Sequence, residues 1–326
     1  MSKKKLMERA VAILQERGSR ALKVAKSVVQ AEEVEYWPLQ ECLHYFLGYW
    51  EDVLHPALVS LACEAVGGNP DITTRIGAAT VLLAGGADIH DDIIDQSVTK
   101  GSKQTVFGKF GKDLAILAGD AMLFEGTYLL HEACQTLPKS KEEAILGLIK
   151  RAFFEISSSE AREASLRLRT DISGTEYLEI IRHKVAASEA SARIGAMLGN
   201  GKMKEAEVLS NYGRTYGILL TIRDEIVDTF EPDELGNRVK KECLPLPLIL
   251  AFHDESKKNA IIQLLEGQIT EKKIEKILNI SMNCRGTQEL IEEAKRIVRQ
   301  ESDRLATIRH CKHTLRLLLR STIEDL

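Results

Sequence analysis

Apolar residues recur every three or four positions along most of the chain. Such spacing places them on one face of an α-helix, and prolines and turn-forming residues separate the segments that carry it. No run of alternating polar and apolar residues predicts a β-strand. The pattern therefore predicts an all-α protein of about ten helices, arranged as one domain over residues 1–326. The clearest periodic positions are Leu6, Ala10, Leu14, Ile291, Ala294, Ile297, Val298 and Leu305.

Two of the predicted helices, residues 75–92 and 212–228, are apolar on nearly every face. A helix of this kind belongs in the interior of a bundle, because it has no polar face to turn towards water. Each of the two nevertheless ends in a group of acidic residues. Both candidates for the centre of the bundle therefore carry clustered carboxylates at one end.

The acidic groups have helical spacing, since each contains a pair of aspartates four residues apart on one helix face. Carboxylates near a helix C-terminus are disfavoured by the helix dipole, so they need a cation. Oxygen ligands without nearby histidine or cysteine favour Mg²⁺, which substrate phosphates usually help to coordinate. Solvated helix ends paired with lysine or arginine are the alternative, which the presence of two such groups makes less favoured. The residues are Asp91, Asp92 and Asp95 in the first group, and Asp224, Glu225 and Asp228 in the second.

The composition excludes some classes of partner but does not identify an activity. With 44% apolar residues, 28% charged residues and a net charge of −4, the chain has no overall attraction to nucleic acid or anionic membranes. No stretch approaches the roughly 18 apolar residues of a membrane span, and the N-terminus does not resemble a secretion signal. The six cysteines form no CxxC pair. They are expected to be reduced and mostly buried, which favours the cytoplasm.

Five stretches resemble motifs of the all-trans polyprenyl diphosphate synthases and occur in the same order as in that family. The resemblance extends from residue 40 to 255, which is most of the chain. The resemblance implies an isoprenoid synthase fold, a single large helical bundle around a deep central cavity. It also implies Mg²⁺, with three ions beside a bound diphosphate, and a homodimer, with a heteromer as an alternative. The stretches are HDDIIDQS, TVFGKFGKDLAILAGDAML, DISGTEYLEIIRHKVAAS, GILLTIRDEIVD and CLPLPLILA.

The reaction implied by this resemblance is prenyl transfer. An allylic prenyl diphosphate loses its diphosphate, isopentenyl diphosphate attacks the resulting cation, and the chain grows by one isoprene unit. Asp91, Asp92, Asp95, Lys184 and Asp224 match the catalytic positions, and the two acidic groups match the metal ligands. The expected substrate-binding residues are Lys100, Lys103, Lys184, Arg223, His55 and Lys241, with Lys240 an equal candidate for the last position.

The stretch YWEDVLHPALVS, residues 49–60, departs from the family pattern for isopentenyl diphosphate. It contains no lysine or arginine, His55 occupies an arginine position, and Glu51 and Asp52 add negative charge. Gly101 also replaces an arginine. Three readings remain: a divergent elongating synthase, an enzyme that uses another acceptor or cyclises its substrate, and a non-catalytic subunit of a heteromeric synthase. We favour the first, and the retained acidic groups argue against the third.

The residues before the first acidic group suggest a long product. Leu83, Gly86 and Ala87 occupy the part of the helix that limits chain length in the family, and two of them are small. This favours a geranylgeranyl or longer product, although small residues also permit close helix packing. Met122 and Phe124 are candidates for closing the tunnel. Asp88 lies one helical turn before Asp91 and Asp92. It is expected to form an ion pair with a cation such as Lys184 or Arg223.

Overall fold

The structure is a computed structural model that describes residues 3–101, 103–228, 231–324 and 326. Within these ranges the chain forms sixteen α-helices, two short 3₁₀ helices at Pro70–Thr73 and Leu305–Thr307, and one small β-hairpin. The first eight helices are α1 (Lys3–Ala31), α2 (Trp37–Tyr49), α3 (Leu54–Ala65), α4 (Thr74–Ile94), α5 (Val106–Phe110), α6 (Lys112–Cys134), α7 (Lys139–Ser165) and α8 (Gly174–Lys184). The others are α9 (Ala186–Leu198), α10 (Met203–Asp228), α11 (Pro232–Lys241), α12 (Leu246–Ala251), α13 (Glu255–Leu265), α14 (Glu271–Met282), α15 (Arg285–Arg304) and α16 (Lys312–Ser321).

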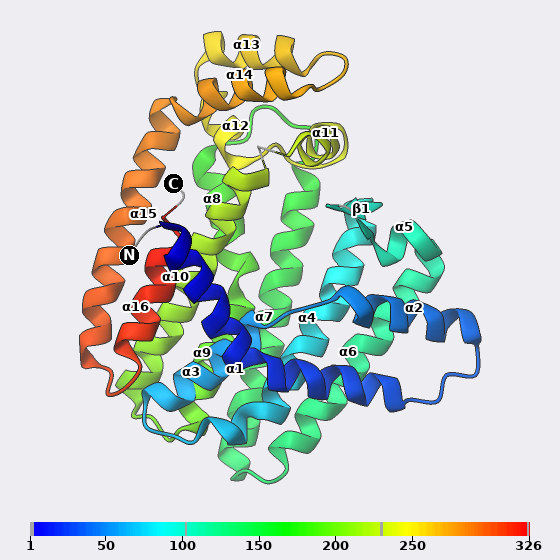
Figure 1. Ribbon diagram of the computed structural model, residues 1–326, viewed down its shortest axis with the longest axis vertical. Coiled ribbons are helices and arrows are strands. Elements are labelled where there is room, and N and C mark those ends of the chain that lie inside the picture. The colour runs from blue at the N-terminus through cyan, green and yellow to red at the C-terminus, as the bar shows by residue number, and fades with distance from the viewer. Residues whose placement is uncertain (1–2, 102, 229–230, 325) are drawn as a thin grey trace.

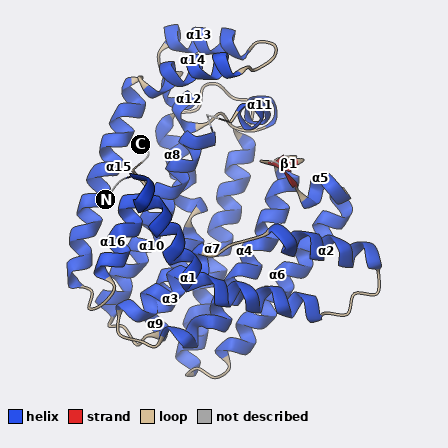
Figure 2. Ribbon diagram, in the orientation of Figure 1, coloured by secondary structure: helices blue, strands red, loops and turns tan. Residues whose placement is uncertain are grey.

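The all-α prediction is confirmed, as the predominance of helix in Figure 2 shows. The expected number of about ten helices was too low. Prolines and turns divide the region after residue 230 into the short helices α11 to α14, which a periodicity argument merges or overlooks. The described ranges nevertheless contain the long helices that the apolar pattern predicted.

Long helices that lie side by side form the body of the molecule (Figure 1). α4 packs along α6, α3 along α9, and α9 along α10. Glycine permits two of these close approaches: a Cβ at Gly195 would lie 2.1 Å from the Val59 carbonyl oxygen, and one at Gly213 would lie 2.4 Å from the Ser188 carbonyl oxygen. Any larger residue at either position would force the helix pair apart.

The apolar core falls into three groups of buried side chains. One lies between α1, α2, α4, α6 and α7, a second between α1, α3, α10, α15 and α16, and a third between α8, α10 and α12 to α14. α4 and α10 contribute to these groups with many buried residues, which agrees with the interior position expected for them. In Figure 1 the α13–α14 pair lies at the top, beyond the ends of the long helices.

The hairpin is short but sits next to the end of α4. β1 (Thr99–Lys100) pairs with β2 (Lys103–Gln104) in an antiparallel register that sets Lys100 opposite Lys103. Gly101 turns the chain with a positive φ of 57°, a conformation that glycine adopts readily. The hairpin thereby fixes the position from which Lys100 reaches back to α4.

Candidate active site

A cavity of about 850 Å³ lies between α3, α4, α7, α8 and α9. Acidic and basic side chains gather in one part of its lining, and alanine, leucine, isoleucine and phenylalanine side chains form most of the rest. The charged or titratable lining residues are Glu51, Asp52, His55, Asp88, His90, Asp91, Glu160 and Lys184. The arrangement suits a substrate with a charged head and a long apolar tail.

The first acidic group lies at the C-terminal end of α4. Asp91 lines the cavity, and its Oδ1 is buried without a hydrogen-bond partner in the described part of the chain. Asp95 follows the helix and forms an ion pair of 2.6 Å with Arg167. Burial raises the pKa of Asp95 to about 6, and the neighbouring Asp91 carboxylate adds to the shift. A cation beside Asp91 and Asp95 would therefore be stabilised.

Asp92 faces Lys100 instead. Its side chain is only 1% exposed, and the Lys100 ammonium lies 2.9 Å from it and 2.7 Å from Asp88. Burial raises the pKa of Asp92 to about 7 and also raises the pKa of Asp88. Asp88 thus forms the expected ion pair, but with Lys100 rather than with Lys184 or Arg223.

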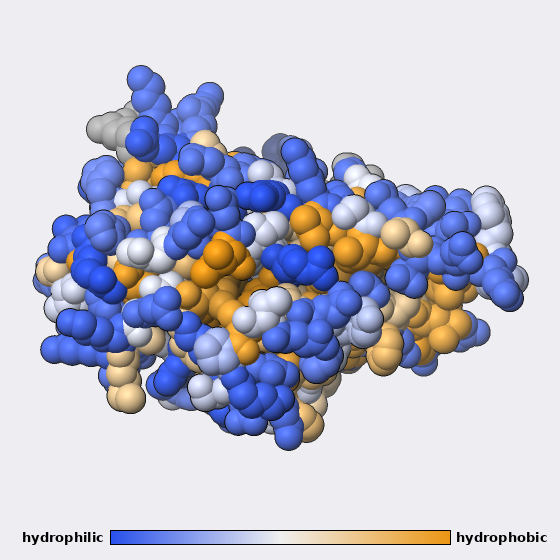
Figure 3. All heavy atoms as spheres, turned by 90° about the horizontal axis from the view of Figure 1, so that it is seen from below, coloured by the Kyte–Doolittle hydropathy of each residue, from blue (hydrophilic) through white to orange (hydrophobic). Residues whose placement is uncertain are grey.

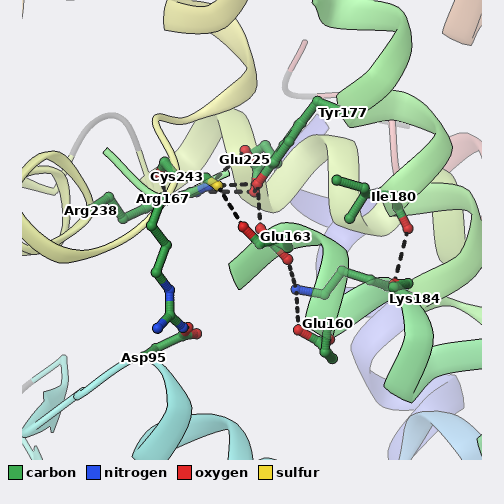
Figure 4. A network of polar contacts seen from close by, with 11 residues as sticks. Asp95, Glu160, Glu163, Arg167, Tyr177, Ile180, Lys184, Glu225, Arg238 and Cys243 are labelled. Carbon is green, nitrogen blue, oxygen red and sulfur yellow. Dashed lines mark hydrogen bonds and ion pairs between the residues drawn. The ribbon is translucent and has the colours of Figure 1, made fainter. Parts of the chain in front are cut away.

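Lys184 ends α8 and points into the same cavity. Its ammonium lies 2.5 Å from Glu163 and 3.2 Å from Glu160, both on α7 (Figure 4). Burial raises the pKa of Glu160 to about 7, whereas Lys184 lowers the pKa of Glu163 against the effect of burial. A diphosphate at Lys184 would compete with these two carboxylates.

The second acidic group divides into an exposed and a buried part. The Asp224 side chain is 61% exposed and lies 3.4 Å from Arg223. Glu225 is buried, forms an ion pair of 3.0 Å with Arg238, and accepts a hydrogen bond of 2.8 Å from the Leu246 backbone N–H. The side chain of Asp228 lies outside the described residues.

Both acidic groups connect to the C-terminal end of α7, as Figure 4 shows. Asp95 contacts Arg167, just beyond α7. Glu225 connects through the Tyr177 hydroxyl, which contacts it at 3.2 Å and Glu163 at 2.8 Å. The ends of α4 and α10 therefore belong to one polar network.

Three members of this network were not anticipated from the sequence: Arg167, Tyr177 and Arg238. Each acts across a long sequence separation, and Tyr177 and Arg238 are almost fully buried. Arg238 donates to Tyr177 and Glu225 and, through Nε, to the Cys243 carbonyl oxygen. For Arg238 the sequence gives one indication, since it is the single arginine between the second acidic group and the proline-rich start of α12.

The departures from the family pattern lie at the start of α3, where Asp52 and His55 line the cavity. His55 Nδ1 lies 2.7 Å from the Asp52 carboxylate, and Asp52 also accepts hydrogen bonds from the backbone of α3. Lys103 lies 5.9 Å above the Tyr49 ring. Lys241 donates to the Gln96 carbonyl oxygen at 3.2 Å, next to the first acidic group, whereas Lys240 is exposed. This placement favours Lys241 over Lys240 as a contact to a ligand at α4.

The three residues considered for chain length face different ways. Leu83 and Ala87 line the cavity, but Gly86 faces α6, where an added Cβ would lie 2.7 Å from Leu123. Phe124 is 75% exposed and Met122 is buried, and neither belongs to the cavity lining. Gly86 therefore serves close packing of α4 on α6, and the wall of the cavity depends on Leu83 and Ala87.

In the described part of the chain, no three histidine, cysteine, aspartate or glutamate side chains lie close enough together to form a complete metal site by themselves. The residues still fit Mg²⁺, because this ion keeps several waters and shares substrate phosphates, so few protein ligands suffice. Asp91 supplies a buried oxygen without a hydrogen-bond partner, and Asp224 supplies an exposed carboxylate. Protein atoms around the Asp224 carboxylate raise its pKa and the neighbouring Glu225 carboxylate adds to the shift, which a nearby cation would reverse.

A sequence model of the family described as "Polyprenyl synthetase" matches residues 38–281. Geranylgeranyl diphosphate synthase from Sulfolobus acidocaldarius is 30% identical over 227 residues, which are 67% of this chain and 69% of that protein. Among solved structures, geranylgeranyl pyrophosphate synthetase from Pyrococcus horikoshii has a TM-score of 0.83 at 24% identity and covers 98% of both chains. Polyprenyl synthase from Caulobacter crescentus, complexed with calcium and isoprenyl diphosphate, has a TM-score of 0.79 at 19% identity over 98% of this chain and 96% of that one.

Proposed function

Because the chain belongs to the polyprenyl synthetase family and is a prenyltransferase of the trans-prenyl diphosphate synthase type, we propose the site and substrates of its reaction as follows. The enzyme ionises an allylic prenyl diphosphate in the cavity beside α4 and joins the prenyl group to isopentenyl diphosphate. The observation that carries this proposal is that Asp91, whose Oδ1 is buried without a hydrogen-bond partner in the described part of the chain, and Lys184 line one cavity together with many apolar side chains.

Asp91, Asp95 and Asp224 would hold magnesium at the mouth of the cavity, with three ions expected from the family resemblance. Magnesium, when bound, supplies positive charge that stabilises the departing diphosphate. Asp92 and Glu225 make contacts to Lys100 and Arg238. In this proposal they orient the two acidic groups, and Asp228 completes the second group.

Lys184 would bind the diphosphate directly, by exchanging its contacts with Glu160 and Glu163 for phosphate oxygens. Lys100 and Lys241 stand beside the first acidic group and would contribute charge from that side. Arg223 borders Asp224 and would do so from α10. The allylic head would thus lie between α4, α8 and α10.

The apolar lining would hold the prenyl tail and keep water from the allylic cation. Leu83 and Ala87 lie on the α4 side of this lining, and Ala152 and Ile156 lie on the α7 side. A small residue at position 87 leaves the cavity open below Asp91. We therefore propose a geranylgeranyl or longer product.

A homodimer would cover an apolar face on α6 and α7. Leu117, Phe124 and Tyr128 lie on one face of α6 and are 52%, 75% and 53% exposed, and Phe154 on α7 is 69% exposed. Hydrophobic patches lie between polar side chains on the face of the molecule in Figure 3. Exposed aromatic surface of this kind is typical of protein–protein contacts.

The cytoplasm is the compartment we propose. All six cysteines are free, and five of them are buried. This fits a reducing environment. None of the helices in the described ranges carries an apolar stretch long enough to cross a lipid bilayer.

The test is incubation of the purified protein and Mg²⁺ with geranyl, farnesyl or geranylgeranyl diphosphate and labelled isopentenyl diphosphate. Longer labelled products are expected from the wild type, with turnover abolished in Asp91→Ala and Asp224→Ala while the helical circular dichroism spectrum is kept. Asp303→Ala, an exposed aspartate on α15, is the matched control and should behave as wild type. Unchanged turnover in Asp91→Ala would overturn the site assignment.

A further inference from the structure

Lys184 lies between two carboxylates of α7 that are held in different ways (Figure 4). Its ammonium is 2.5 Å from Glu163 and 3.2 Å from Glu160. Glu163 also accepts a hydrogen bond of 2.8 Å from the Tyr177 hydroxyl, to which Arg238 in turn donates. Within the described ranges, Lys184 is the one group that forms an ion pair or a hydrogen bond with the Glu160 side chain. Glu163 is therefore fixed by two partners and Glu160 by one.

The charges around the Lys184 ammonium do not balance. Two carboxylates contact one ammonium, so this part of the cavity carries a net negative charge, and Asp91 lines the same space. The side chains of Glu160 and Lys184 are 21% and 27% exposed, so water screens their charges only in part. A diphosphate that reaches Lys184 without a metal ion would thus meet a surplus carboxylate at Glu160.

We propose that Glu160 makes the binding of the allylic diphosphate depend on magnesium. This inference rests on the proposed function, because it takes Asp91 as a metal ligand and Lys184 as a diphosphate ligand. Without magnesium, the Glu160 carboxylate holds Lys184 and repels the phosphate oxygens. With magnesium at Asp91, the Glu160 carboxylate leaves Lys184 and is stabilised by the metal charge, so the ammonium can turn to the diphosphate. Glu160 therefore selects the metal-bound form of the substrate.

This selection excludes an unproductive complex. An allylic diphosphate that bound at Lys184 without metal would occupy the cavity, but its leaving group would lack the positive charge that stabilises it. Inorganic diphosphate without metal would be kept from Lys184 in the same way. Glu163 does not provide this selection by itself, because one carboxylate only balances the ammonium, whereas Glu160 is the surplus charge.

The experiment measures the binding of inorganic diphosphate to the full chain by isothermal titration calorimetry, once with Mg²⁺ and once with EDTA in its place. It is run at pH 8, above the pKa of about 7 to which burial raises Glu160, so that this carboxylate is ionised. The wild type should bind diphosphate more weakly without Mg²⁺. In Glu160→Gln, which keeps the size of the side chain, the affinity without Mg²⁺ should rise about tenfold or more, because a like charge beside the ligand is gone. Its affinity with Mg²⁺ should change little.

Two further variants separate this inference from its premise. Glu143→Gln makes the same change at an exposed glutamate of α7 and should leave both affinities as in the wild type. Lys184→Gln tests the proposed diphosphate site, and it should weaken binding with Mg²⁺. Thermal unfolding followed by circular dichroism checks that each variant is folded at the temperature of the titration.

The outcomes distinguish the two claims. An unchanged affinity of Glu160→Gln without Mg²⁺ would overturn the inference and leave the proposed function intact. An equal rise of its affinity with and without Mg²⁺ would do the same, because Glu160 would then repel diphosphate without any link to the metal. Unchanged binding by Lys184→Gln with Mg²⁺, or no binding by the wild type with Mg²⁺, would overturn the proposed site and the inference with it.

Discussion

Arg238 and Glu225 form a buried ion pair that we expect to stabilise the site rather than to bind metal. Arg238 is 5% and Glu225 is 8% exposed. Their side chains lie 3.0 Å apart, and Arg238 also donates to Tyr177 at 2.8 Å and to the Cys243 carbonyl oxygen at 3.1 Å. Removing the arginine leaves a buried carboxylate that keeps hydrogen bonds but loses this cation.

The expected cost follows from this burial. Breaking a buried ion pair by removing one partner costs about 3–5 kcal/mol, because the other charge stays in a poorly solvated place. Arg238→Met should therefore lower the free energy of unfolding by about this amount, and Glu225→Leu by a similar amount. The double variant removes both charges and should be more stable than either single variant.

The assay is urea unfolding followed by far-UV circular dichroism for the wild type, both single variants and the double variant. The double-mutant cycle gives the coupling free energy of the pair. Arg296→Met is the matched control, because Arg296 pairs with Glu293 on the exposed face of α15, and we expect a loss below about 1 kcal/mol. A loss of that small size in Arg238→Met, or additive losses in the double variant, would refute the reasoning.

Three further predictions concern pH, product length and assembly. Burial raises the pKa of Glu242 from 4.5 to about 7. The stability that the protonated carboxyl contributes is therefore fully present below pH 4.5 and is lost as the pH rises through about 7. Glu242→Gln should make the free energy of unfolding less dependent on pH over this range, and wild-type and variant curves that run parallel would contradict this. Ala87→Phe should shorten the product in chain-length analysis, whereas Gly86→Ala should leave its length unchanged and cost about 1–3 kcal/mol of stability, because its Cβ meets Leu123. Phe124→Glu with Phe154→Glu should convert a dimer to a monomer in light scattering, while Tyr36→Glu, exposed on the α1–α2 connection, should not; a dimer that survives the double change excludes this face.

The sequence allowed the fold class and the position of the acidic groups to be predicted, because both follow from local periodicity. The apolar run before Asp91 and the one before Asp224 each form a long helix that reaches the core. Family resemblance then placed Lys184 near the first group. The structure is consistent with this, since Lys184 and Asp91 line one cavity.

Contacts between distant elements could not be predicted in the same way. The partner of Asp88 depends on the hairpin that turns Lys100 back towards α4, and a two-residue strand leaves no periodic pattern. The pairing of Arg167 with Asp95 depends on where the chain leaves α7. Gly86 is a third case. It is the neighbour of Ala87 on α4, but Ala87 lines the cavity whereas Gly86 lies on the face that packs on α6.

Three cations at the site have a common property that constrains how ligands bind. Lys100, Lys184 and Arg167 each lie within 3 Å of a carboxylate: of Asp88, Glu163 and Asp95, respectively. A diphosphate that binds a cation therefore releases a carboxylate, and a metal ion that binds a carboxylate releases a cation. The carboxylate that diphosphate binding releases can then bind the metal ion, and the cation that metal binding releases can then bind the diphosphate. Each binding event therefore favours the other, which couples the binding of metal to that of diphosphate.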